Sequence, residues 1–301
     1  MKRLIGAILV TLLGGCGALS LSMNPEPIAA HPPQAVDEHV PRRVALVLSG
    51  GSARGFAHIG VIRVLEEAGI RPDLIVGSSV GAIVGALYAG GYDAAALAAA
   101  AEETGWELFG EIELSWNMLG VIRGTRIQSF VNRHLKHRSF EQLPIPFAAV
   151  ATDVNSGELV AFNRGDVGVA VRASTALPVI FAPVTIGGRR FADGGILSPL
   201  PVATARRLGA HIVIAVDVVY SPAESAVTSP MAMMFQTFLI QTHRLKEFEA
   251  READLTFGPA LHATGQYTFA DRAFLIAEGE RAARAALPTI RDLIARPVPP
   301  K

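Results

Sequence analysis

The chain has 301 residues, half of them apolar and 18% charged, and its 27 basic and 27 acidic side chains give a net charge of zero. This length and apolar content suffice for one sizeable core, so we expect a single α/β domain from Arg42 onward. Lys and Arg are not clustered along the chain. The sequence therefore excludes the basic surface that a nucleic-acid-binding protein needs.

The first residues resemble a bacterial export leader. Lys2 and Arg3 supply a positive start, and an uncharged apolar run follows from Leu4 to Leu13. This run is too short to span a bilayer as a permanent helix. The only cysteine, Cys16, follows two glycines, as in the lipobox of bacterial lipoproteins, and a single cysteine excludes an internal disulfide.

We therefore expect residues 1–15 to be a lipoprotein signal peptide and Cys16 to be lipidated. The proline-rich residues 16–41 are predicted to form an extended tether. The protein would then be anchored to a membrane of the bacterial cell envelope and face the periplasm, with the outer membrane as one option. The alternative is an ordinary leader that is cut nearby, with an incidental cysteine.

The first part of the body predicts alternating strands and helices. Val44 to Leu48 predicts a strand that ends at a glycine-rich loop, and apolar residues from Ile59 to Leu65 then recur at helical spacing. Leu74 to Val76 predicts the next strand, and the small-residue stretch Ala82 to Ala89 predicts a second helix. This order favours a parallel sheet with helices on both faces.

The rest of the body predicts further strands and three helices. Strands are expected at 146–154, 159–162 and 211–218, a hairpin at 185–186 and 190–191, and helices at 202–208, 231–248 and 271–294. Pro288 predicts a kink in the last helix. We expect the last two helices to close the same domain.

Gly77-Ser78-Ser79-Val80-Gly81 lies between a predicted strand and a predicted helix. In that position the pattern is typical of a nucleophile elbow, a sharp turn that exposes the middle serine in a strained backbone geometry. Gly77 and Gly81 are needed because a Cβ there would collide with the neighbouring strand and helix. Ser79 is therefore the candidate nucleophile.

A serine hydroxyl needs a group that accepts its proton, and three aspartates are candidates. Asp193 precedes Gly194 and Gly195, which let the backbone bend tightly and bring the carboxylate close to another loop. Asp153 and Asp217 lie near strand ends, where an aspartate more often caps a turn through its own backbone. We favour Asp193.

A histidine that follows the acid would complete a triad of the α/β-hydrolase kind. After Asp193 only His211, His243 and His262 remain, and none has a loop setting that singles it out. His58, in the helix after the glycine loop, is better explained as a packing or capping residue. The residues alone leave a triad open.

Three ordered motifs carry a resemblance to a known family: L-S-G-G-S-A-R-G at 48–55, G-S-S-V-G at 77–81 and D-G-G at 193–195. They resemble the motifs of the patatin-like phospholipase family. The resemblance implies a three-layer patatin-like α/β fold with a mostly parallel central sheet. It also implies a catalytic domain at 42–220 and a helical extension at 221–301 packed on that domain.

The resemblance further implies a Ser-Asp dyad without histidine, in which Ser79 attacks an ester carbonyl and Asp193 is the general base. An ordinary aspartate, with a pKa of about 3.9, is a weak base at neutral pH. We therefore expect Asp193 to lie in a partly dry pocket, which makes it more basic. Neither a metal nor an organic cofactor is expected, since no metal-ligand spacing of His, Cys or acids is present.

The glycine loop is expected to supply the oxyanion hole through the backbone amides of Gly50, Gly51 and Ser52, with Arg54 and Gly55 as supporting loop residues. The family usually has glycine at the position of Ser52. This departure leaves the amide in place and affects only the expected backbone angle.

The predicted function is therefore the hydrolysis of lipid carboxylic esters, of the phospholipase A or lysophospholipase type. Two alternatives stay open: an esterase or thioesterase for other acyl groups, and an inactive lipid-binding lipoprotein. Dinucleotide binding is disfavoured for two reasons. The dinucleotide-binding fingerprint has glycine at the position of Ser52, and it has an acidic residue at the end of the second strand, whereas Asp73 precedes that strand. Two apolar stretches, at 106–119 and 231–239, could belong to the core or could contact lipid, and the sequence does not decide between these roles.

Overall fold

The computed structural model describes residues 31–36, 39–104, 120–222, 227–261 and 268–297. All of them belong to one compact unit that begins at His31. The predicted signal peptide, Cys16, His262 and the apolar stretch at 106–119 lie outside the described residues.

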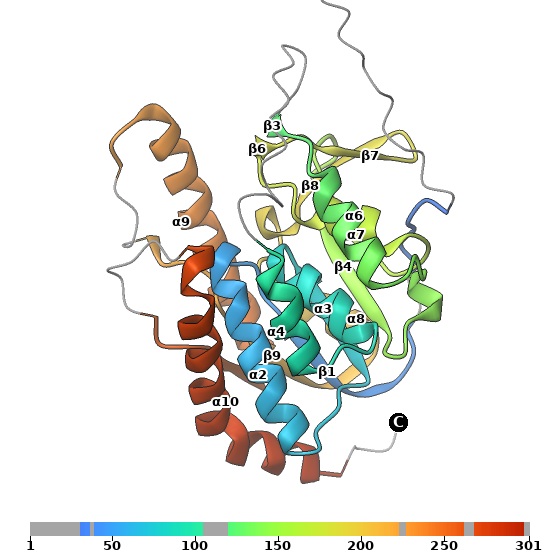
Figure 1. Cartoon of the computed structure of the whole chain (residues 1–301), viewed down its shortest axis with the longest axis vertical. Helices are drawn as coiled ribbons and strands as arrows, with labels where there is room; N and C mark the ends of the chain where they lie inside the picture. The colour runs from blue at the N-terminus through green and yellow to red at the C-terminus, as the bar shows by residue number, and fades with distance from the viewer. Residues whose placement is uncertain (1–30, 37–38, 105–119, 223–226, 262–267, 298–301) are drawn as a thin grey trace, which may run out of the picture. The chain divides into compact units, whose positions relative to one another are not determined.

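A mostly parallel sheet forms the centre of the fold (Figure 1). Its parallel strands are, in spatial order, β10 (Leu255–Phe257), β9 (Ala210–Val216), β1 (Arg42–Leu48), β2 (Leu74–Ser78) and β4 (Phe147–Asp153). Three further strands pair in antiparallel fashion, namely β5 (Leu159–Phe162), β8 (Arg189–Asp193) and β7 (Val184–Ile186). A separate parallel pair joins β3 (Gly120–Ile122) and β6 (Val179–Phe181). The central strands are nearly continuous apolar runs because helices cover both faces.

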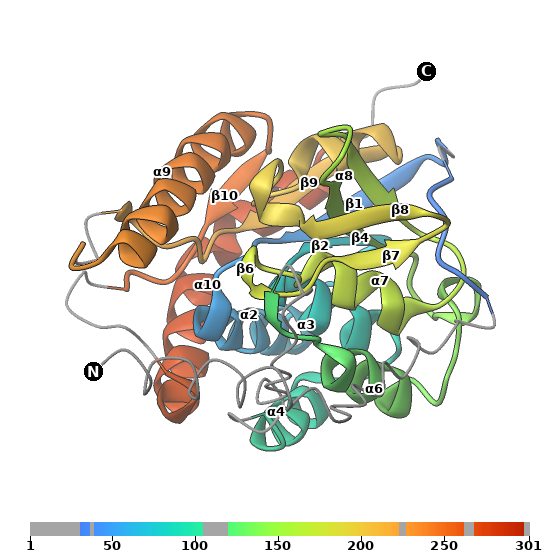
Figure 2. The ribbon, with the colours of Figure 1, turned by 90° about the horizontal axis from the view of Figure 1, so that it is seen from above.

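Figure 2 shows the helices on the two faces of the sheet. One face carries α2 (Phe56–Glu67), α3 (Val80–Ala89), α7 (Val167–Ser174) and α10 (Arg272–Ala295), with α4 (Ala94–Glu102) and α6 (Thr125–His134) outside them. The other face carries α8 (Val202–Arg207) and α9 (Pro230–Arg251). Single turns of 3-10 helix include η1 (Ser52–Gly55), η2 (Phe140–Gln142), η3 (Gly194–Ile196) and η5 (Phe269–Asp271). The predicted α/β architecture is confirmed.

The C-terminal helix α10 packs along α2 at very close range. A Cβ on Gly60 would lie 2.0 Å from the carbonyl oxygen of Ile276, and a Cβ on Gly279 would lie 2.0 Å from that of Ala57. The helix continues through Pro288, and Figure 1 shows its axis turning in this last part. The contact ties α10 to the same body as the sheet.

The last residues of the predicted tether contact the body of the fold. Gln34 forms an antiparallel bridge with Arg164, and the side chain of Asn163 bonds both the amide and the carbonyl of Val36 at 2.9 Å. A Cβ on Gly209 would lie 2.0 Å from the carbonyl oxygen of Val40. The backbone groups of these residues therefore have partners on the body, and the extended tether at 16–41 stays a prediction.

Candidate active site

The glycine loop and the elbow lie at the same edge of the sheet. β1 and β2 are parallel neighbours in which Leu48 is paired with Gly77, so their carboxyl ends lie side by side. A Cβ on Gly50 would lie 3.3 Å from the Cβ of Ser79, which places the loop against the elbow. In open α/β sheets this edge is where ligands bind.

The backbone at Ser79 is strained. Its φ of 52° and ψ of −125° fall where residues with a side chain are rarely found. A Cβ on Gly77 would lie 2.5 Å from the carbonyl oxygen of Gly81, and a Cβ on Gly81 would lie 2.2 Å from that of Leu48. The amide of Ser79 donates to Ser174 Oγ at 3.0 Å, which fixes the turn from the side of α7.

β8 brings Asp193 next to the elbow. A strand can pair along two edges. β5 pairs with one edge of β4, and the residues of β4 that pair with β5 also pair with β2 or with β8. β2 and β8 therefore share the other edge end to end, since β2 pairs up to Val150 and Asp193 pairs with Ala151. A Cβ on Gly194 would lie 2.9 Å from Ser78 Oγ, in agreement with this placement.

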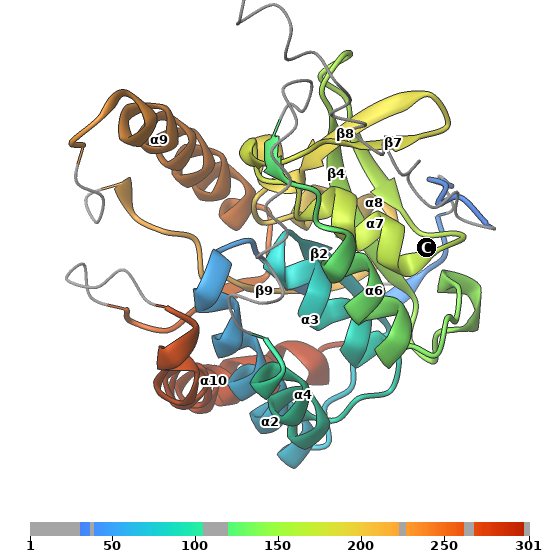
Figure 3. The same ribbon diagram turned by 45° about the horizontal axis from the view of Figure 1, so that its top comes forward.

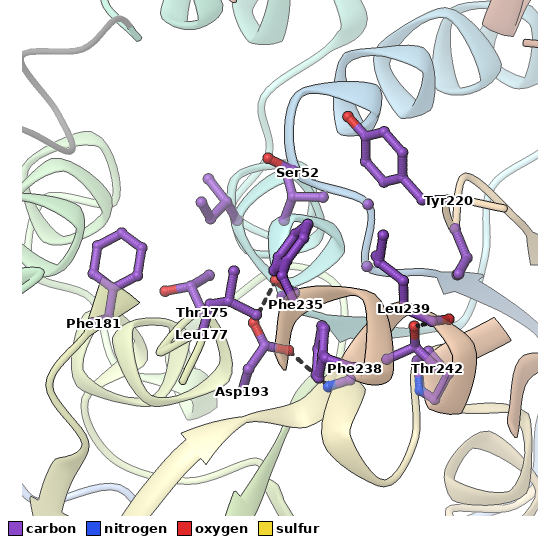
Figure 4. A pocket seen from close by; sticks show the side chains of 18 of the residues that line it. Ser52, Thr175, Leu177, Phe181, Asp193, Tyr220, Phe235, Phe238, Leu239 and Thr242 are labelled. Atoms are coloured by element: carbon purple, nitrogen blue, oxygen red, sulfur yellow. Dashed lines mark hydrogen bonds between the residues drawn. The ribbon is translucent and has the colours of Figure 1, made fainter. Parts of the chain in front are cut away.

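Ser79 and Asp193 are in direct contact. Ser79 Oγ donates a hydrogen bond to Asp193 Oδ2 at 2.7 Å, and the amide of Gly195 donates to Asp193 Oδ1 at 2.7 Å (Figure 4). Asp193 is only 2% exposed. This burial raises the pKa of its carboxyl to about 6, against the opposing effect of the two hydrogen bonds.

The other two candidate acids are engaged elsewhere. Asp153 accepts from the amide of Asn155 at 2.8 Å and from Arg189 at 2.5 Å, and these partners lower its pKa to about 2. Asp217 accepts from the amide two residues onward at 2.9 Å and pairs with Lys246 at 2.6 Å. Both cap a turn through their own backbone, as their positions near strand ends predicted.

The described histidines do not reach the pair. His58 is fully buried, and its ring Nε2–H donates to the carbonyl of Ser49 at 3.0 Å. Burial lowers its pKa to about 4, so it is neutral at physiological pH. His243 lies 3.6 Å from Glu247 on α9, and neither it nor His211 borders the cavity around Ser79. Within the described part of the chain, no histidine extends the pair into a triad.

The glycine loop differs in one respect from the expected set of three donors. The amide of Gly50 donates to the carbonyl of Pro199 at 3.0 Å, so the expectation that it offers a free donor is wrong. Ser52 has a φ of 50°, the left-handed region in which glycine is usual. Among the described residues, the amides of Gly51 and Ser52 have no protein acceptor, and both residues line the cavity beside Ser79.

A sequence model of the patatin-like phospholipase family matches residues 46–206, and this stretch contains all three motifs. The chain belongs to this family. At family level, membership supports the hydrolysis of lipid esters.

Relatives with a longer chain share the patatin-like segment. An uncharacterized NTE family protein of Mycobacterium tuberculosis is 43% identical over 175 residues, which cover 58% of this chain and 49% of that protein. Human patatin-like phospholipase domain-containing protein 6 is 35% identical over 181 residues, which cover 58% of this chain and 13% of the human protein. The chain thus spans about half of the mycobacterial relative and a small part of the human one.

One solved structure shares the patatin-like fold. The crystal structure of VipD from Legionella pneumophila matches with a TM-score of 0.55 and 14% sequence identity, over 87% of this chain and 70% of that chain. At this level of identity the likeness concerns the fold alone.

In this patatin-like domain, Arg54 and Gly55 connect the glycine loop to neighbouring segments. Arg54 is buried, and its guanidinium lies 3.9 Å from the centre of the Tyr220 ring. A Cβ on Gly55 would lie 2.3 Å from a methyl group of Val80, so the loop packs directly on the helix that begins at the elbow.

A cavity of about 140 Å³ opens over Ser79 and Asp193. The helix α9, whose apolar stripe the sequence left unassigned, contributes Phe235, Phe238 and Leu239 to its wall (Figure 4). Sequence reasoning also missed other lining residues: Thr175, Leu177, Phe181, Val219, Tyr220, Thr242 and Phe269. They come from separate segments, and no motif connects them.

Among the described residues, no helix combines the length and the apolar character that crossing a bilayer requires.

Proposed function

We propose that the protein is a serine hydrolase of lipid carboxylic esters, of the phospholipase A or lysophospholipase type, with Ser79 as nucleophile and Asp193 as general base. The observation that carries the proposal is the 2.7 Å hydrogen bond from Ser79 Oγ to Asp193 Oδ2, formed between residues 114 positions apart. A largely apolar cavity over this pair supports an acyl ester as the substrate.

The acylation step follows from this geometry. Ser79 Oγ forms a bond to the carbonyl carbon of the ester while its proton passes to Asp193 Oδ2. The negative charge that develops on the carbonyl oxygen is stabilised by the amides of Gly51 and Ser52. Removing one such donor typically costs about 3 kcal/mol of transition-state stabilisation. The ester C–O bond then breaks, and Asp193 returns the proton to the leaving alcohol.

Deacylation reverses the roles with water as the nucleophile. Water gives a proton to Asp193 and attacks the acyl-Ser79 carbonyl, and the bond between Ser79 Oγ and the acyl carbon breaks. The proton returns from Asp193 to Ser79 Oγ as the fatty acid leaves. A carboxylate with a pKa of about 6 suits this two-way transfer better than an ordinary aspartate.

A fluorophosphonate probe tests the nucleophile. We expect covalent labelling of the wild type at Ser79, no labelling of Ser79→Ala, and normal labelling of Ser156→Ala, which changes an exposed serine on a turn far along the chain. A wild type that is folded but not labelled would favour an inactive lipid-binding protein. Undiminished labelling of Ser79→Ala would exclude Ser79 as the nucleophile.

The substrate class needs a separate measurement. Wild type and Ser79→Ala are incubated with phosphatidylcholine, lysophosphatidylcholine, a triacylglycerol and an acyl thioester, and the released fatty acid is quantified. We expect release from the two phospholipids by the wild type alone. Release only from the thioester or the neutral lipid would replace the phospholipase proposal by the esterase or thioesterase alternative.

Anchoring at a membrane of the cell envelope through lipidated Cys16 is part of the proposal and depends on residues 1–16 alone. Mass spectrometry of the mature N-terminus is expected to find a diacylglyceryl group on Cys16. Cys16→Ser is expected to move the protein from the membrane fraction to the soluble fraction. An unmodified N-terminus downstream of Cys16 would overturn the anchor without affecting the hydrolase proposal.

A further inference from the structure

A second cavity, of about 50 Å³, adjoins the one over Ser79. The two share Ser52, Val80, Ile83 and Phe269 in their walls. By a measure in which one water molecule needs roughly 10–15 Å³, the second cavity has room for several methylene groups.

The second cavity runs along α3, away from the reacting serine. Val80, Ile83, Val84 and Leu87 line it, and their spacing of i, i+3, i+4 and i+7 places them on one face of that helix. Ser79 immediately precedes this stripe. From Val80 to Leu87 the helix rises by roughly 10 Å, the length of about eight extended carbon atoms.

Exposure falls along this stripe with distance from Ser79. Val80 and Ile83 are half-buried, whereas Val84 is 7% and Leu87 is 3% exposed. At the far end the cavity is bordered by Leu97 and Phe130, which are 2% and 3% exposed. The wall residues at the far end of the cavity are therefore more deeply buried than those next to Ser79.

The walls of the second cavity suit only an apolar occupant. Among the described residues that line it, none carries a charged side chain, and besides Ser52 only Thr104 is polar. A headgroup or a charged alcohol would lose its hydration there without gaining partners. Two small residues of α4, Ala100 and Ala101, face the stripe across the cavity and are 4% and 5% exposed. Larger side chains at these positions would fill the space.

We propose that this cavity between α2, α3 and α4 is the acyl-chain subsite, that it holds the far part of a chain of about eight carbons, and that Ala100 and Ala101 set its width. The inference rests on the proposed function, because the acyl group is defined by the attack of Ser79. With the carbonyl carbon at Ser79, the chain enters past Val80 and Ile83 and ends near Leu97.

A series of soluble p-nitrophenyl esters with 2 to 16 acyl carbons tests the subsite. For the wild type, kcat/KM is expected to rise about fourfold per methylene up to about eight carbons and then to level off or fall. Ala101→Leu is expected to move the optimum to shorter chains and to lower the ratio of octanoate to butyrate hydrolysis at least tenfold. Leu97→Ala, which lengthens the inner end, is expected to move the optimum to longer chains.

Ala99→Leu is the matched control, because Ala99 lies on the same helix, is exposed and does not border the cavity. Its chain-length profile is expected to coincide with that of the wild type, and thermal melting checks that each variant is folded. Unshifted profiles in both Ala101→Leu and Leu97→Ala, with an active wild type, would overturn the subsite alone. A folded wild type that hydrolyses no ester of the series would instead overturn the proposed function.

Discussion

The cavity over Ser79 has two walls that are built in different ways. The wall at the end of the sheet consists of the glycine loop, the elbow and the turn after β8, and backbone contacts too close for a Cβ fix it at Gly51, Gly77, Gly81 and Gly194. The facing wall is α9, which contributes mainly apolar side chains. Residues 230–242 of α9 carry no charge, and Met233 and Met234 are more than half exposed. Figure 3 shows α9 at the margin of the fold, apart from α2 and α10.

The two walls are joined by a few polar contacts. Glu249 on α9 accepts from the hydroxyl of Ser198 and from the amide of Leu200, the latter at 2.8 Å. Burial raises the pKa of Glu249 to about 7. Between these two residues, Pro199 accepts from the amide of Gly50. Ser79 and Asp193 are thus fixed by the sheet end, while α9 shapes the apolar space in front of them.

Among changes to the sheet-end wall, Asp193→Asn should produce the largest loss of hydrolytic activity. We expect kcat/KM to fall on the order of 10²–10⁴-fold, because an amide of the same size cannot accept the proton of Ser79. Ester hydrolysis and thermal melting measure activity and folding. Asp153→Asn is the control, since Asp153 is equally buried but does not border the cavity, and its activity should stay near that of the wild type. Activity of Asp193→Asn within tenfold of the wild type would contradict the assignment.

Gly81→Ala tests the close contacts of the same wall. The added Cβ would lie 2.2 Å from the carbonyl oxygen of Leu48, and we expect a loss of about 3 kcal/mol or more in unfolding free energy. Gly69→Ala is the matched control, because Gly69 has a φ of 70° but open space around it, so only about 1–2 kcal/mol of backbone strain is expected. Equal losses in denaturant titrations of the two variants would show that the contact is relieved by a small shift.

The pH dependence of hydrolysis tests the environment of Asp193. As the proposed base, Asp193 works only when deprotonated, and burial raises the pKa of its carboxyl to about 6. For an uncharged ester, kcat/KM should therefore rise about tenfold per pH unit below pH 6 and level off above it. The proton is bound more tightly in the folded state, so this group contributes stability below pH 4 that is lost as the pH rises through 6. A profile that is flat from pH 4.5 to 7.5 would contradict a raised pKa.

Phe238→Ala should have the smallest effect on hydrolysis, because Phe238 belongs to α9, the wall that only shapes the apolar part of the cavity. We expect KM to rise about three- to tenfold, as for an apolar contact made equally in the ground and transition states, with kcat within twofold. Phe248→Ala, on the same helix, 62% exposed and away from the cavity, should leave both constants unchanged. A large fall in kcat for Phe238→Ala would mean that α9 also positions the reacting groups.

Some elements could not be predicted from the sequence because their local pattern is weak. The helix α4 is nearly all alanine and has no apolar period, and α7 is short and buried on every side. The strand β10 has three residues and lies at the sheet edge. The antiparallel placement of β5 and β8 depends on which edge of β4 is free to pair. No local sequence pattern indicates which edge that is. By contrast, β1, β2, β4 and β9 were predicted because strands buried on both faces must be apolar throughout.

By itself, the sequence predicted sharp turns at the elbow and at D-G-G, because glycine is the residue that fits where a turn brings the backbone close to other atoms. Tertiary structure alone decided that Asp193 meets Ser79, that burial raises the pKa of that carboxyl, that the Gly50 amide is occupied, and that α9 closes the cavity. These properties depend on desolvation and strand pairing between distant segments, and such interactions exist only once the sheet has formed.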